Sequence, residues 1–120
     1  LQGSFGAQIN AGIASVGAGG IVQRTTFEST NGPTQNGYGA HAQLMITAPG
    51  TYPISFGYRF AILDPSSLIL TDRVMEHTVG SVMSVPSLRM RVQLQLTHVM
   101  EQAARELSNS RAQLAAEIQL

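Results

Sequence analysis

The chain has 120 residues, 43% hydrophobic and only 12% charged, and its seven arginines and seven acidic residues give a net charge of zero. This length predicts one domain spanning residues 1–120. The lack of cysteine excludes disulfides and thiolate metal sites, and zero net charge excludes a global field that would steer the chain toward nucleic acid or membrane. No apolar run approaches the ~20 residues of a transmembrane helix, so we expect no membrane partner.

The small share of charged residues is about half the usual value of about 25%. Few charges then remain to keep the surface soluble by itself, which favours a subunit of an assembly over a freely diffusing monomer. A small neutral domain with a Ser, Thr and Gln surface is the open alternative.

The N-terminal region has the pattern of two strands. Residues 4–16 alternate apolar side chains with small or polar ones, and residues 21–29 are rich in β-branched and aromatic side chains. Between them stands Gly17-Ala18-Gly19-Gly20, which lacks the spacing of a phosphate-binding loop and is typical of a tight turn. We predict an N-terminal β-hairpin over residues 4–29.

A polar loop is predicted at Thr30–Gly39, where Asn-Gly occurs twice. Residues 41–48 and 52–63 then alternate around Pro49-Gly50, which predicts a second hairpin. The pattern of residues 68–83 fits a helical face loosely, but Gly80 and the β-branched residues favour strand or loop. For this segment we expect a strand over 68–79 and a mobile stretch at Gly80–Pro86.

The clearest alternation runs from Leu88 to His98. Its apolar face holds Leu88, Met90, Val92, Leu94 and Leu96, and its polar face holds Arg89, Arg91, Gln93, Gln95 and Thr97.

After this strand the apolar spacing changes to three and four residues, and Ser110-x-x-Gln113 has capping-box spacing. One bent helix, or two helices near 98–108 and 110–120, should follow. The expected fold is α+β: an antiparallel sheet within the strand-rich residues 4–97, with one or two C-terminal helices in 99–120 packed on one face.

No catalytic motif is present, so we expect neither enzymatic activity nor a cofactor. His41, His77 and His98 are far apart in the sequence and have no metal-ligand spacing, which predicts no metal site.

The less apolar faces of the predicted strands collect side chains able to contact phosphates and base edges. Our candidate nucleic-acid-binding residues are Arg24, His41, Gln43, Arg59, Arg89, Arg91, Gln93 and Gln95. The simpler alternative is that any exposed sheet face needs polar residues.

The predicted order of an N-terminal hairpin at 4–29, strands at 41–63 and 88–97, and helices from 99 resembles the coat proteins of small single-stranded RNA phages. The resemblance implies a homodimer with one continuous sheet, helices packed on the partner, and RNA on the opposite face. It therefore implies a self-assembling capsid protein, located in the virion and in the host cytoplasm during assembly. A structural subunit of a protein-only filament, tail or shell is the alternative function.

Overall fold

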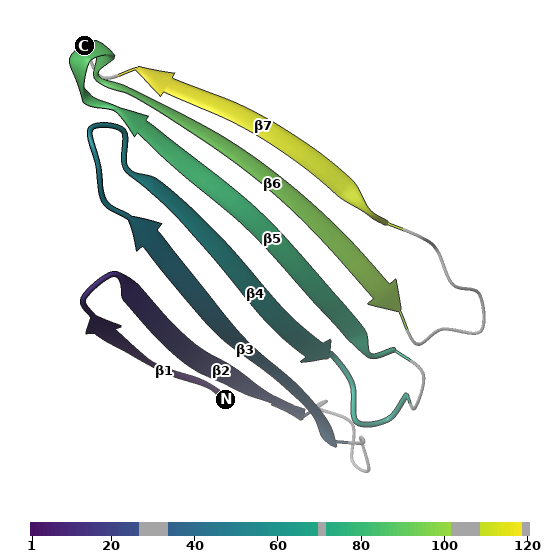
Figure 1. The fold of residues 1–120 in the computed structure, drawn as a ribbon. Coiled ribbons are helices and arrows are strands. Elements are labelled where there is room, and N and C mark those ends of the chain that lie inside the picture. Colours follow the sequence, from purple (N-terminus) through teal and green to yellow (C-terminus); the bar gives the residue numbers. More distant parts are fainter. Residues whose placement is uncertain (27–33, 70–71, 102–108, 119–120) are drawn as a thin grey trace.

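The computed structural model describes residues 1–26, 34–69, 72–101 and 109–118. The described residues form seven strands in one antiparallel sheet, and each strand pairs with its neighbours in the sequence (Figure 1). The strands are β1 (Gln2–Ala11), β2 (Ala14–Thr26), β3 (Thr34–Ala48), β4 (Ile54–Asp64), β5 (Val74–Val85), β6 (Met90–Glu101) and β7 (Arg111–Ile118).

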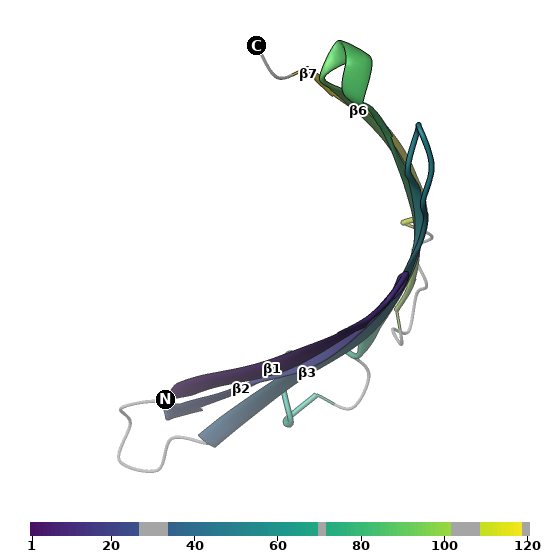
Figure 2. The same ribbon diagram turned by 60° about the vertical axis from the view of Figure 1, so that its left-hand side comes forward.

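The sheet is a single layer that bends strongly, as the edge-on view shows (Figure 2). Its Cα radius of gyration is 18.8 Å, whereas a compact domain of this length would have about 14 Å. No hydrophobic side chain among the described residues is buried. The chain therefore has no hydrophobic core of its own within the described part.

The two ends of the sheet differ. At one end, here called the turn end, the chain reverses at residues 12–13, 49–53 and 86–89 (Figure 1). Gly12 supplies a left-handed φ of 59° for the first reversal. The 3₁₀ turn η1 (Pro86–Leu88) closes the third, with Arg89 at φ 47°. At the opposite end, the loop end, the strands border residues 27–33, 65–73 and 102–110.

The predicted α+β fold with C-terminal helices is wrong, because the described residues form one all-β antiparallel sheet. Residues 98–101 continue β6, and 111–118 form β7; residues 102–108 and 119–120 lie outside the described part. The segment also fits a period of two, since Ala112, Leu114, Ala116 and Ile118 alternate with more polar residues. Pairing with the edge of β6 satisfies backbone groups of both strands, which decides between the two periods.

Other predicted boundaries also move. Gly17–Gly20 lies inside β2, because glycine permits a turn without requiring one, and the reversal occurs at residues 12–13. Thr34–Gly39, expected in a loop, belongs to β3.

The strand expected at 68–79 begins at Val74, and the expected mobile stretch is strand as far as Val85. Leu88 and Arg89, expected at the start of the strand over 88–98, lie in the turn before β6. The turn at Pro49-Gly50 and the strand that follows it are confirmed.

Glycines make room where the sheet bends. A Cβ atom on Gly19 would lie 2.8 Å from Cε1 of His41 and 2.9 Å from the backbone oxygen of Phe5. A Cβ on Gly17 would lie 3.1 Å from Nε2 of Gln43. Side chains from β3 thus fill the space that these glycines leave over β2.

We expect Gly19→Ala to lower the free energy of unfolding by about 1–3 kcal/mol, because the backbone oxygen of Phe5 cannot move aside as a side chain can. Gly50→Ala is the matched control: nothing lies within 4 Å of its added Cβ, so the change should stay within about 0.5 kcal/mol. Urea unfolding followed by circular dichroism measures both. Equal effects of the two substitutions would contradict this account of the bend.

Candidate functional site

The candidate functional site is the pair of opposite faces of the bent sheet. Side chains alternate along a strand, and antiparallel partners project to the same face, so the register assigns each residue to one face. The row through Gln8, Gly17, Gln43, Arg59 and Thr78 belongs to one face. This is the concave face, where side chains crowd together: Gly17, Gly19 and Thr97 are buried there.

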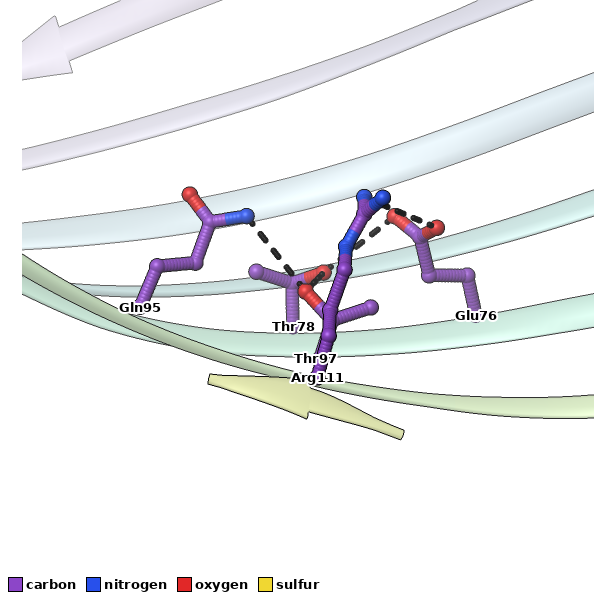
Figure 3. A network of polar contacts seen from close by, with 5 residues as sticks. All are labelled: Glu76, Thr78, Gln95, Thr97 and Arg111. Carbon is purple, nitrogen blue, oxygen red and sulfur yellow. Dashed lines mark hydrogen bonds and ion pairs between the residues drawn. The ribbon is translucent and has the colours of Figure 1, made fainter. Parts of the chain in front are cut away.

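The concave face carries a polar network across three strands (Figure 3). Thr78 of β5 donates to Oε1 of Glu76 over 3.2 Å, and its hydroxyl lies 3.3 Å from that of Thr97 on β6. Gln95 donates to the Thr97 hydroxyl over 3.4 Å, and Arg111 of β7 lies 3.9 Å from Glu76. Thr97, at the centre, is only 3% exposed.

Charge is segregated between the faces. By register, the described strands place Arg59, Arg91, Arg111, Glu76, Glu101 and Glu117 on the concave face. Only Arg24 and Asp64 project from the convex face, and both stand near the loop end. The concave face thus balances three arginines with three glutamates in the described part.

The structure brings only some of the candidate residues predicted from the sequence to one face. The register brings His41, Gln43, Arg59, Arg91, Gln93 and Gln95 to the concave face. Arg24 lies on the opposite face, and Arg89 lies in the turn after η1, outside the strands. Sequence reasoning missed Glu76, Thr78 and Arg111, because Glu76 and Thr78 fell in an ambiguous segment and Arg111 in an expected helix. Alternation had placed Thr97 on the polar face, but it was not named as a candidate.

The convex face is apolar along most of its length. It presents large side chains from every strand that are well exposed, among them Ile9 at 73%, Phe56 at 59% and Leu114 at 76%. Its other large apolar residues include Phe5, Val16, Val22, Leu44, Ile46, Val79, Met83, Leu94, Leu96 and Ile118. A continuous apolar surface of this extent marks a contact site.

A polar rim borders this apolar surface at the loop end. On the convex face it consists of Arg24 on β2, Asn36 on β3 and Asp64 on β4. His77 and His98 add polar side chains on β5 and β6, further from the loop end, in the row of Phe60. Tyr38 lies beside it and accepts a hydrogen bond of 3.0 Å from Arg73, which stands 3.6 Å from Asp64. On β2 to β4 the apolar surface therefore ends in side chains that favour water.

Two shallow hollows of about 480 and 370 Å³ lie mainly on the concave face. Arg59 borders both, and Gln8, Gln43, Gln93 and Gln95 border the smaller one. The described residues contain no cluster of three or more histidine and acidic side chains suited to a metal ion. None of their helical segments has the length and apolar character needed to cross a membrane.

Comparison with known proteins finds no matching family model, no matching curated protein and no matching solved structure.

We expect Thr97→Val to lower the free energy of unfolding by about 0.5–1.5 kcal/mol, because valine has nearly the same shape but cannot bond Thr78 and Gln95. Thr25→Val is the control, since Thr25 lies on the same face of β2, distant from this network. Urea unfolding of both variants measures the difference. A loss as large for Thr25→Val as for Thr97→Val would show that the network contributes nothing specific.

Proposed function

We propose that this chain is a membrane-embedded sheet whose convex face contacts lipid acyl chains and whose concave face lines a water-filled passage. The observation that carries the proposal is the segregation of the two faces. Strands that cross a bilayer within a curved sheet alternate apolar residues toward lipid with polar residues toward the interior. The proposal departs from the expectation, drawn from the sequence, of a virion subunit without a membrane partner.

The lengths of the strands fit a bilayer. A tilted strand needs about 9–11 residues to cross the hydrocarbon layer. Strands β2 to β6 contain 13, 15, 11, 12 and 12 residues. Between the turn end and the polar rim, no Arg, Asp or Glu of these strands projects from the convex face.

The convexity of the apolar face favours lipid over a protein partner. A second sheet or a helix would need a matching concave apolar surface. The concave face of this sheet carries most of its charges and glutamines, so another copy does not offer a continuous apolar one. Acyl chains are fluid and cover a convex surface of any radius. Tyr38 near the rim and Tyr52 in the turn at the opposite end also suit the two interfaces of a bilayer, where tyrosine is enriched.

The concave face suits water. Its glutamines and threonines hydrogen-bond to one another, and Arg111 pairs with Glu76. The glycines keep the space above β2 open to the side chains of β3. The balanced charges on this face give little support to a phosphate-binding surface, which gains affinity by neutralising phosphates with excess cations.

Lipid contact places a requirement on the two edges. In the described part, β1 and β7 each pair with one strand only. Hydrocarbon cannot hydrate the free backbone groups of an edge strand, so every such group must find a protein partner. The proposal therefore requires further strands along both edges when the sheet is in a membrane.

The proposal predicts that labels on the two faces of β6 are accessible to different quenchers. Because the chain has no cysteine, single substitutions Val92→Cys, Leu94→Cys and Leu96→Cys can carry a fluorophore on the convex face. We expect a lipid-soluble quencher to act on these three positions in phospholipid vesicles. Labels at Arg91→Cys, Gln93→Cys and Gln95→Cys, on the concave face, should respond to a water-soluble quencher instead.

The opposite results have distinct meanings. Convex labels shielded from both quenchers would indicate a protein partner on that face, as a coat or shell subunit requires. Labels on the convex face that respond to the water-soluble quencher would show that the sheet does not enter the bilayer. Either result would overturn the proposal.

A second prediction uses neighbouring residues on opposite faces. We expect Leu94→Arg to destabilise the vesicle-bound sheet by about 2–4 kcal/mol, the cost of an arginine facing lipid near the midplane. Gln93→Arg is the matched control, because it adds the same charge to the concave face and should change stability by less than about 1 kcal/mol. Urea unfolding in vesicles measures both. Similar losses for the two variants would rule out lipid contact by the convex face.

A further inference from the structure

Two histidines and two methionines stand in adjacent rows of the convex face, at the loop end of β5 and β6. His77 is the antiparallel partner of His98, and Met75 is the partner of Met100. Because neighbouring positions on one face are two residues apart, the two pairs lie side by side. Directly opposed residues have Cβ atoms about 4.5–5.5 Å apart, which lets the ends of such side chains meet.

Both imidazoles are held through the same ring nitrogen. Nδ1 of His77 is 2.7 Å from the hydroxyl of Tyr58 on β4, and Nδ1 of His98 is 2.8 Å from the hydroxyl of Ser110, which precedes β7. These partners lie on the outer sides of the β5–β6 pair. The Nε2 atom, across the ring from Nδ1, is left for another ligand on each histidine.

This arrangement is the one that metal-binding histidines use. A ligating histidine normally donates its second ring N–H to an oxygen, which fixes the tautomer and the orientation of the ring. Two imidazole nitrogens on one tetrahedral ion lie about 3.4 Å apart when each bond is about 2.05 Å. Opposed histidines on paired strands can reach that separation.

We propose that His77, His98, Met75 and Met100 form a site for a copper ion, favouring Cu(I). Imidazole binds several transition metals, whereas thioether sulfur is a soft ligand that selects Cu(I) over zinc. His98 and Met100 are exposed and His77 is half-buried, so an ion can reach the site. The sequence concealed this set, because its members are about twenty positions apart and the register alone brings them together.

The inference depends on the register of β5 and β6 and on no contact with lipid, so it can fail separately from the proposed function. The test uses the folded full chain in detergent micelles, with Cu(I) kept reduced by ascorbate and its affinity measured by competition with a chromogenic chelator. We expect one Cu(I) per chain. His77→Gln and His98→Gln should each weaken binding more than about tenfold, as loss of even an outer partner does.

Other variants separate ligands from structural residues. Met75→Leu and Met100→Leu should weaken Cu(I) binding while leaving Zn²⁺ binding unchanged, since leucine preserves shape but not sulfur. Tyr58→Phe, which removes the oxygen that positions His77, should weaken binding about tenfold. His41→Gln and Met45→Leu are the controls, because both residues belong to the concave face.

Absence of Cu(I) binding by the folded chain would overturn the proposal. So would unchanged affinity in the double variant His77→Gln/His98→Gln, or a loss in His41→Gln equal to that in His98→Gln. Circular dichroism of each variant confirms that the sheet is retained. Should His77→Gln fail to fold, Tyr58→Phe and the two methionine variants decide the question.

Discussion

The structure depends on one constraint: a single-layer sheet has no second layer to cover its apolar face. Globular domains bury such a face against helices or another sheet, and that burial is the main favourable term in folding. Here no hydrophobic side chain of the described residues is buried. The hydrogen bonds between strands define the shape, but an external apolar phase or partner must supply the hydrophobic stabilisation.

The bend gives the two faces different environments. Side chains converge on the concave face and diverge on the convex face, so glycine is needed where β2 meets the side chains of β3. The same convergence brings Glu76, Thr78, Thr97 and Gln95 within hydrogen-bonding distance. Curvature therefore accounts for both the crowded polar network and the openly exposed apolar surface.

The loop-end rim combines the two environments. Polar residues of β2 to β4 end the apolar surface there. On β5 and β6 the hydroxyls of Tyr58 and Ser110 orient two histidines that stand among apolar neighbours. Polar groups beside an apolar surface have few competing partners, so their mutual geometry is well defined. The proposed metal site depends on this fixed orientation of the two rings.

The sequence by itself determined much of this protein. The alternation correctly predicted strand at 41–48, 54–63 and 90–97, and it correctly separated Met90, Val92, Leu94 and Leu96 from Arg91, Gln93 and Gln95. It also located the reversal at Pro49-Gly50. These features are local: the period of two belongs to each strand, whatever its neighbours.

Only the tertiary structure decided the rest. Residues 111–118 satisfy a helical and a strand period equally, and pairing with β6 selects the strand. Glycines 17, 19 and 20 are compatible with a turn, and the need for space beneath His41, Gln43 and Phe5 places them in β2. The Arg111–Glu76 pair and the His77–His98 pair join residues distant in sequence. Register and curvature are properties of the whole sheet, so no local pattern of side chains could have specified these contacts.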